Sequence, residues 1–262
     1  MNAMSDWVAA HALPVWSGLL VLALLSGDLA WQWNRRHYDA AIARGHTPVV
    51  LRSRTAAWLL VSGCFLFMAI ALAIGEQTRS WLSGFDVGLA EDLRAHMQPG
   101  VLSVVAMASH LGDLATVAAI SAAVLGILIW RRHLRAATVW TIAVAGIVPL
   151  NSALKAWFQR PRPLYDHGFI VEHGWSFPSG HAFGAMVFYG MLAYVLLRLT
   201  PRRWHRWVIA LAVAMVTIIG LSRIVLQVHY FSDVMAGYIS GAVWLLLCIA
   251  GAEWWRSRSV DD

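Results

Sequence analysis

Charged residues are scarce in this chain, and lysine is almost absent. Asp, Glu, Lys and Arg together make up 13% of the 262 residues, whereas hydrophobic residues make up 59%. In a typical soluble domain about a quarter of the residues are charged, so this composition excludes an ordinary soluble globular protein. Lys155 is the one lysine, and the other nineteen basic residues are arginines.

Cysteine is also rare, which excludes a fold held together by several disulfides. Cys64 and Cys248 both lie inside apolar runs, and we interpret them as buried thiols rather than as a disulfide or a metal-binding pair. Internal repeats, low-complexity tracts and linkers rich in Gly, Pro and Ser are absent from the sequence. We therefore expect one domain over residues 1–262.

Long apolar runs, by contrast, are abundant. A helix needs roughly 20 residues to cross about 30 Å of hydrocarbon, and in lipid a helix satisfies its own backbone hydrogen bonds. Seven runs are long enough: Leu13–Trp33, Thr55–Ile74, Val101–Trp130, Ala136–Leu154, Ala182–Leu199, Trp207–Val228 and Val234–Trp255. The sequence therefore predicts an all-α fold, a polytopic membrane helix bundle.

The arginines gather in the connectors between alternate runs. These connectors contain Arg35, Arg36, Arg44, Arg52 and Arg54; Arg131, Arg132 and Arg135; Arg198, Arg202, Arg203 and Arg206; and Arg256 and Arg258. By the positive-inside rule we assign these four regions to the cytoplasm and the N-terminus to the outside. The net charge of +6 is then a feature of membrane topology, and no nucleic-acid partner is expected. The expected location is the inner (plasma) membrane of a bacterial-type cell.

Three segments on the predicted outer side hold most of the unusual polar residues. They are NSALKAWFQRPRPLYD over 151–166, WSFPSGH over 175–181 and GLSRIVLQVHYFSD over 220–233. In the first segment, Lys155 lies seven residues before Arg162, where positive charge is otherwise scarce, and a snorkelling interfacial lysine is the alternative interpretation. Pro161 and Pro163 restrict the backbone around Arg162, so its guanidinium is expected to project from a stiff, non-helical segment.

The second segment has the features of a helix start. Pro178 suits the first turn of a helix and Ser176 suits its cap, while Gly180 would let a ligand approach the backbone closely. The fifth run would then begin with free N–H groups at the positive end of a helix dipole, which favours an anion. His181 follows at once, and it makes a functional site a better interpretation than an ordinary turn.

The third segment combines a histidine with an acid and an arginine. If the backbone stays helical, Ser222 and His229 share a face, and Asp233 follows His229 by four residues. A carboxylate one helical turn away can orient an imidazole and raise its basicity. Arg223 adds a planar fork of donors that suits phosphate oxygens.

Collected in one pocket, these residues predict phosphoryl transfer that needs no metal ion and no other cofactor. Lys155, Arg162 and Arg223 would neutralise a dianionic phosphate and the charge of its transition state. His229 has the acid partner and is the better nucleophile, whereas His181, at the helix start, is the better general acid. Attack would form a phosphohistidine, and water activated by His181 would then release inorganic phosphate.

The order and spacing of these residues resemble the three-part signature of the type-2 phosphatidic acid phosphatase superfamily. The matching parts are Lys155 to Pro163, Pro178 to His181 and Ser222 to Asp233, within the signature region 151–233. The resemblance implies a metal-independent phosphatase with His229 as nucleophile, His181 as acid/base and Asp233 orienting His229. It also implies that the phosphate is held by Lys155, Arg162, Ser179, the Gly180 backbone and Arg223. Membrane members have a six-helix core, so the first of the seven runs would be an additional N-terminal helix or would not cross the membrane.

An outward-facing pocket beside the bilayer favours a lipid phosphate whose chains remain in the membrane. From the resemblance we expect hydrolysis of undecaprenyl diphosphate or of a glycerophospholipid phosphate, and the lipid substrate and the bilayer are the expected partners. The oligomeric state is not predicted. Residues 1–100 contain the first two runs and the amphipathic segment Phe85–Gly100, which either lies on the outer membrane surface beside the access route of the lipid or is a plain connecting helix.

Three other functions account for parts of the sequence. A lipid phosphotransferase would use the same residues and pass the phosphoryl group to an acceptor other than water. A vanadium-dependent haloperoxidase has a similar anion pocket in soluble relatives, and seven apolar runs argue against it. A carrier or channel would account for the polar residues Asp28, His110 and Asp113 within the runs but not for the three-part signature, so we interpret those residues as interface or packing residues.

Overall fold

The structure is a computed structural model, described here for residues 3–43, 53–75, 80–163, 170 and 172–261. The described residues form helices and no strands. The α-helices are α1 (Ala3–Ala10), α2 (Ala12–Ala43), α3 (Ser53–Gly75), α4 (Trp81–His96), α5 (Pro99–Ser109), α6 (Leu114–Trp130), α7 (Leu134–Ala145), α8 (Ile147–Phe158), α9 (Gly180–Leu199), α10 (His205–Val225) and α11 (Phe231–Asp261). Two short 3₁₀ helices, η1 (His110–Gly112) and η2 (Arg202–Trp204), precede α6 and α10.

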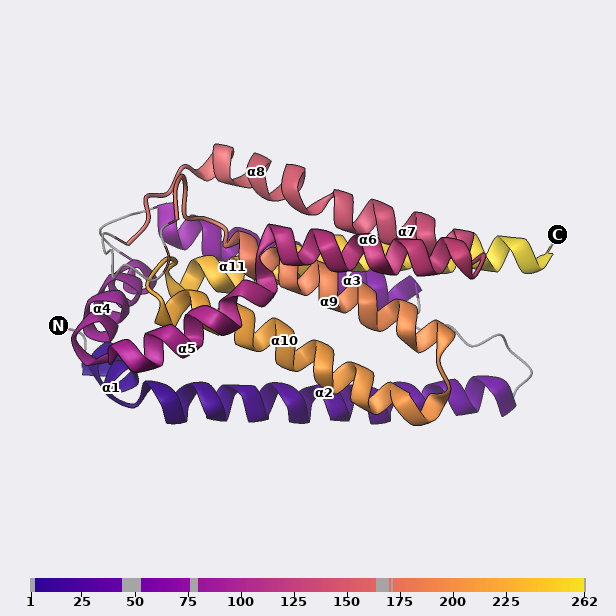
Figure 1. The fold of residues 1–262 in the computed structure, drawn as a ribbon, viewed down its shortest axis with the longest axis horizontal. Coiled ribbons are helices and arrows are strands. Elements are labelled where there is room, and N and C mark those ends of the chain that lie inside the picture. The colour runs from indigo at the N-terminus through magenta and orange to yellow at the C-terminus, as the bar shows by residue number, and fades with distance from the viewer. Residues whose placement is uncertain (1–2, 44–52, 76–79, 164–169, 171, 262) are drawn as a thin grey trace.

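The long helices lie lengthwise in one bundle (Figure 1). Within the described residues six helices are long and apolar enough to cross a membrane, and the bent pair Pro99–Gly112 and Leu114–Trp130 makes a seventh crossing if it is one span. The predicted all-α membrane bundle is therefore confirmed, and the protein is a multi-pass membrane protein. The first apolar run lies in α2, which is one of the six.

The third apolar run differs from its prediction because it is bent. We expected one span over Val101–Trp130, but α5 and α6 meet at an angle of 41°. The break lies at η1 and Asp113, whose extended backbone (φ −66°, ψ 146°) ends one helix before the next begins. The Asp113 carboxylate bonds to two histidines rather than facing lipid, which gives this polar interruption a place inside the fold.

Helix α9 lies at the centre of the bundle and is packed against α7, α8, α10 and α11. Buried residues of α9 such as Phe183 and Phe188 form the main core together with Trp140 of α7 and Ile219 of α10. The outer helices show the opposite pattern, because large apolar side chains of α2 and α3 are exposed, as lipid-facing side chains are. The central helix α9 therefore fixes the position of the segments at its two ends.

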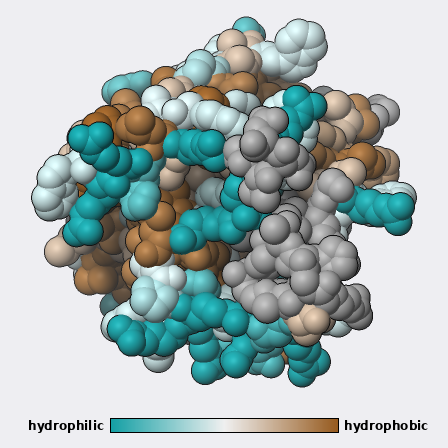
Figure 2. Space-filling view, turned by 90° about the vertical axis from the view of Figure 1, so that its right-hand side faces the viewer, coloured by the Kyte–Doolittle hydropathy of each residue, from teal (hydrophilic) through white to brown (hydrophobic). Residues whose placement is uncertain are grey.

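The two ends of the bundle differ in chemistry. The α6–α7 and α9–α10 connections and the C-terminus lie at one end, to the right in Figure 1, and hydrophilic side chains gather around that end (Figure 2). Ion pairs join its arginines to α2, from Arg206 to Asp28 at 2.6 Å and from Arg202 to Asp39 at 2.7 Å. The α10–α11 turn and the start of α9 lie toward the opposite end, beside α4 and α5 (Figure 1).

Candidate active site

The predicted nucleophile lies in a tight turn rather than on a helix. We expected Ser222 and His229 to share a helical face, but α10 ends at Val225. Gln227 then takes a left-handed backbone conformation with φ 54°, and the backbone N–H of His229 donates to the carbonyl of Arg223 at 3.3 Å. This turn closes the end of α10 and places His229 just before α11.

The two ring nitrogens of His229 face different partners. Nδ1 lies 3.5 Å from Asp233 Oδ2 and 3.3 Å from Ser176 Oγ, while Nε2 lies 3.1 Å from Arg162 Nη1. Because a guanidinium can only donate, Nε2 must accept and Nδ1 must carry the proton. Burial of His229, a residue that is 2% exposed, lowers its pKa to about 3. The imidazole is therefore neutral at pH 7, with the lone pair of Nε2 directed toward Arg162.

Ser176 has a different task from the one predicted. We expected it to cap a helix that begins near Pro178, but the N-cap of α9 is Ser179, whose hydroxyl accepts from the N–H of Ala182. The hydroxyl of Ser176 donates instead to the carboxylate of Asp233, which also accepts from the N–H of Tyr230 at 2.9 Å. Ser176 thus lies between the predicted nucleophile and its acid partner.

The start of α9 is packed tightly against two other helices. The N–H of Ser179 donates to the carbonyl of Asp233 at 2.9 Å, which ties the cap to α11. A Cβ on Gly237 would lie 2.6 Å from the carbonyl oxygen of Ser179, and a Cβ on Gly180 would lie 3.0 Å from Asn151 Oδ1. Glycine at both positions therefore lets the predicted anion-binding helix end approach α8 and α11 closely.

The predicted phosphate-binding arginines are fixed by backbone and side-chain oxygens. Arg162 donates to the carbonyls of Val228 at 2.8 Å and Gly174 at 3.0 Å, so its backbone partners are one residue of the third motif segment and the residue just before the second. Arg223 is fully buried and donates from Nη1 to Ser109 Oγ at 2.7 Å. These bonds hold both guanidinium groups in place.

A carboxylate that sequence reasoning missed lies among these cations. Glu172 pairs with Arg223, and its Oε2 lies 3.7 Å from Arg162 Nη2 while its Oε1 lies 3.9 Å from His181 Nδ1. Lys155 is close enough for its charge to interact with Glu172 and both arginines. Although burial opposes ionisation, the neighbouring charges of Arg223, His181 and Arg162 hold the pKa of Glu172 below its ordinary value. The three predicted phosphate-binding cations thus lie around one anionic group.

His181 has an acid partner of its own, from outside the three motif segments. Its Nε2 lies 2.9 Å from Oδ1 of Asp113, and Oδ2 of Asp113 lies 2.7 Å from His110 Nδ1. From the sequence we interpreted Asp113 and His110 as interface or packing residues. The signal that could have identified them is their position as the polar interruption of an otherwise apolar run.

Arg160 was also missed, and it connects the site to α4. Its guanidinium donates to Asp233 at 2.7 Å, to Asp86 at 2.8 Å and to Ser232 at 2.8 Å, and it lies 4.3 Å from the ring centroid of Tyr230. Asp86 belongs to the predicted amphipathic segment, and α4 is indeed a helix in the structure. The buried face of α4 therefore carries an acid that takes part in the network around Asp233.

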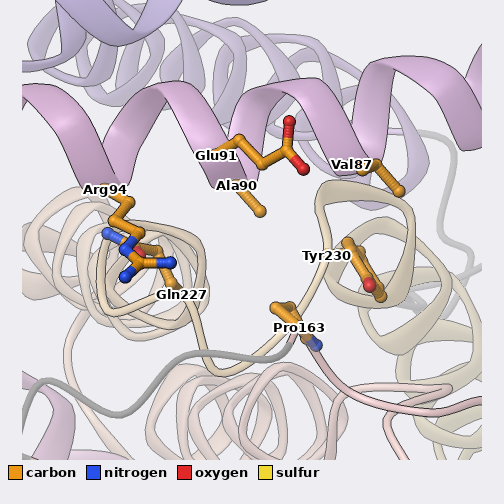
Figure 3. Close-up of a pocket in the computed structure, with 7 residues that line it drawn as sticks. All are labelled: Val87, Ala90, Glu91, Arg94, Pro163, Gln227 and Tyr230. Atoms are coloured by element: carbon orange, nitrogen blue, oxygen red, sulfur yellow. The ribbon is translucent and has the colours of Figure 1, made fainter.

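A cavity of about 200 Å³ lies beside the site, between α4 and residues of the first and third motif segments. It is lined by Val87, Ala90, Glu91, Arg94, Pro163, Gln227 and Tyr230 (Figure 3). Pro163 follows Arg162 and Tyr230 follows His229 in the chain, so the cavity adjoins the segments that carry the site.

Comparisons with known proteins point to one family. Residues 134–257 match the model of the PAP2 superfamily. Phosphatidylglycerophosphatase B of Bacillus subtilis (strain 168) is 34% identical over 100 residues, which are 37% of this chain and 49% of that relative. The match thus spans about half the length of the curated relative. The crystal structure of the first transmembrane PAP2 type phosphatidylglycerolphosphate phosphatase, from Bacillus subtilis, superposes with a TM-score of 0.70 at 25% identity, covering 75% of this chain and 96% of that one.

Proposed function

Because residues 134–257 match the model of the PAP2 superfamily, we propose that the protein is a member of that family and a phosphatase that removes phosphate from a membrane lipid. The observation that carries this proposal is the meeting of Arg162, Arg223 and His181 around the single carboxylate of Glu172. A phosphate group, like a carboxylate, is an anion whose oxygens accept hydrogen bonds, so it can take the place of that carboxylate among the same donors. The neutral Nε2 of His229 lies beside Arg162, where it can attack a bound phosphorus.

In the first step, His229 Nε2 attacks phosphorus, so that a P–N bond forms and the P–O bond to the lipid breaks. His181 gives a proton to the departing oxygen. A lipid monophosphate then leaves as an alcohol, and a lipid diphosphate leaves as a monophosphate. Arg162, Arg223 and Lys155 stabilise the charge on the three equatorial oxygens. Asp233 holds the proton on Nδ1 of His229 and stabilises the positive charge of the phosphohistidine.

In the second step, water attacks the phosphohistidine. His181, now neutral, takes a proton from the water as its oxygen bonds to phosphorus and the P–N bond breaks. Inorganic phosphate leaves, His229 is neutral again and His181 is protonated again. One water molecule is consumed in each cycle, and both histidines return to their starting protonation states.

We propose a glycerophospholipid phosphate as the substrate, ahead of undecaprenyl diphosphate, because both relatives are named for phosphatidylglycerophosphate. The site is proposed to face outside the cytoplasm, since it lies at the end of the bundle opposite the arginine-rich connections. The cavity between α4 and the first and third motif segments supports α4 as the border of the lipid access route.

Phosphate release by the purified protein in detergent with EDTA tests the proposal. Phosphatidylglycerol phosphate, phosphatidic acid and undecaprenyl diphosphate would be compared, and at least one should release phosphate. His229→Ala should abolish release, whereas His96→Ala, which changes an exposed histidine on α4, should not. Radiolabelled phosphate found on a second lipid with little free phosphate would indicate a phosphotransferase instead. No release from any substrate would refute the proposal.

A further inference from the structure

The bend in the third span places the carboxylate of Asp113 beside His181, the predicted acid/base. Asp113 lies between η1 and α6, outside the residues 134–257 that match the family model. One of its oxygens lies 2.9 Å from His181 Nε2 and the other lies 2.7 Å from His110 Nδ1. Both oxygens are therefore engaged, and the carboxylate cannot rotate away from His181 without losing a second bond.

The turn that carries Asp113 is packed directly onto His181. A Cβ on Gly112 would lie 3.0 Å from His181 Cδ2 and 2.6 Å from Ile219 Cγ2, so only glycine fits here without a shift. The hydroxyl of Tyr189, on α9, donates to the carbonyl of Leu111 at 2.9 Å. These contacts fix the turn against α9 and α10 and set the distance from Asp113 to the imidazole.

We propose that Asp113 is a positioning residue that holds His181 by Nε2 and stabilises its protonated form, so that Nδ1 is the atom that exchanges a proton with the substrate. The inference rests on the proposed phosphatase function. Its geometric support is that Nδ1 lies on the side of Glu172 Oε1, at 3.9 Å, where the arginines converge, while Nε2 lies on the side of Asp113. The charged groups around His181 are thus Asp113, Glu172 and Arg223.

The proposal predicts which substrates depend on Asp113. In the first step the proton on His181 Nδ1 moves to the oxygen of the breaking P–O bond, and Asp113 keeps its bond to the Nε2–H throughout. An alkyl oxygen of a lipid is a poor leaving group and needs this proton, whereas p-nitrophenolate leaves without one. Loss of Asp113 should therefore slow the release of lipids far more than the release of p-nitrophenol.

The closing experiment compares these two leaving groups in Asp113→Asn. Turnover of the preferred lipid phosphate should fall about 100-fold, while the initial burst of p-nitrophenol from p-nitrophenyl phosphate should change by no more than roughly threefold. Asp28→Asn is the matched control, because Asp28 pairs with Arg206 at the opposite end of the bundle, and both rates should be unchanged. Equal losses on both substrates, or no loss on the lipid, would overturn the proposal.

Two further measurements keep the result interpretable if the asparagine variant folds poorly. Gly112→Ala leaves the carboxylate in the chain but displaces its turn, and it should give the same selective loss on the lipid. Independently of any activity, ¹⁵N NMR of histidine-labelled protein should show the proton of neutral His181 on Nε2, and a proton on Nδ1 alone would overturn the inference. If the wild type hydrolyses no lipid, the proposed function fails while this NMR result still tests the Asp113 contact.

Discussion

Replacing Arg160 with methionine tests whether a buried ion network supports the acid partner of His229. The guanidinium donates to Asp233 at 2.7 Å and to Asp86 at 2.8 Å. Arg160 is 8% exposed, Asp86 1% and Asp233 0%, so neither carboxylate can turn to water when the cation is removed. Methionine retains much of the length and apolar volume of arginine, and the substitution therefore removes mainly the charge and its hydrogen bonds.

The expected destabilisation follows from what each carboxylate retains. Breaking a buried ion pair by removing one partner costs about 3–5 kcal/mol, because the other charge stays buried. Asp233 keeps Ser176, the N–H of Tyr230 and His229 beside it, whereas Asp86 keeps its bonds from Ser232. Most of the loss should therefore arise at Asp86, and we expect the free energy of unfolding to fall by about 3 kcal/mol.

The loss should depend on pH, and the structure gives its sign. Burial raises the pKa of Asp86 above its ordinary value even with Arg160 beside it. A carboxyl with a raised pKa binds its proton more tightly in the folded state, so the stability it contributes is present at low pH and is lost as pH rises toward the folded pKa. Removing Arg160 raises that pKa further. The destabilisation should therefore be larger at pH 8 than at pH 5.

The assay is reversible unfolding in detergent micelles at both pH values, for Arg160→Met, Asp86→Asn and the double variant. Neutralising Asp86 removes the unpaired charge, so the double variant should be more stable than Arg160→Met alone, with a coupling of roughly 1–3 kcal/mol. Arg202→Met is the matched control, because Arg202 and Asp39 form an exposed pair and its loss should cost at most about 1 kcal/mol. A loss that is independent of pH and not recovered in the double variant would refute the reasoning.

Three further substitutions test the site. Ser176→Ala removes a hydroxyl that donates to Asp233, and turnover should fall about tenfold in steady-state kinetics, with an unchanged rate counting against this role. Glu172→Gln removes the carboxylate that competes for the phosphate-binding cations, so the inhibition constant of inorganic phosphate should fall about tenfold rather than stay constant. Gly237→Ala would bring a Cβ within 2.6 Å of a carbonyl oxygen at the α9 cap and should cost about 1–3 kcal/mol in unfolding, whereas Gly251→Ala, with open space around its Cβ, should be neutral.

The spans could be predicted from the sequence because a bilayer imposes a length and an apolar composition on every crossing helix. The breaks inside the spans could not be predicted from the sequence. The chain bends at Asp113, whose carboxylate meets His181, 68 residues away. The junction of α7 and α8 at Gly146 lies where the indole of Trp244 would be 2.6 Å from an added Cβ. Both features depend on which helix lies opposite, and hydropathy does not contain that information.

The sequence predicted that the motif residues lie together in one site, because cations and histidines in a hydrophobic chain need a common anionic partner. Their local geometry was partly wrong. We expected Ser176 to cap the helix, but Ser179 caps α9, and only the packed structure gives Ser176 the carboxylate of Asp233 as its partner. The helical spacing assumed for His229 also failed, because α10 ends at Val225. Capping and spacing rules describe isolated helices, whereas the conformation of these residues is determined by partners on a neighbouring helix.

The supporting acids were missed because they lie on elements that carry no motif. Asp86 comes from α4 and Asp113 from the bend before α6, and each reaches the site only after its element docks on the bundle. Glu172 lies between two motifs, and nothing in its neighbours along the chain indicates that it pairs with Arg223. Residues that act through another residue are therefore harder to identify from sequence than the groups that touch the substrate.

The two histidine–aspartate pairs differ in burial, and this difference suits the opposite tasks proposed for them. The side chains of His229 and Asp233 are 1% and 0% exposed, whereas those of His181 and Asp113 are 17% and 37% exposed. In the first pair burial disfavours the imidazolium, so His229 keeps the lone pair that a nucleophile needs. In the second pair the 2.9 Å contact with Asp113 stabilises the charged imidazole, which is what a proton donor needs. Exchanging the two environments would therefore leave one histidine without a lone pair and the other without a proton to give.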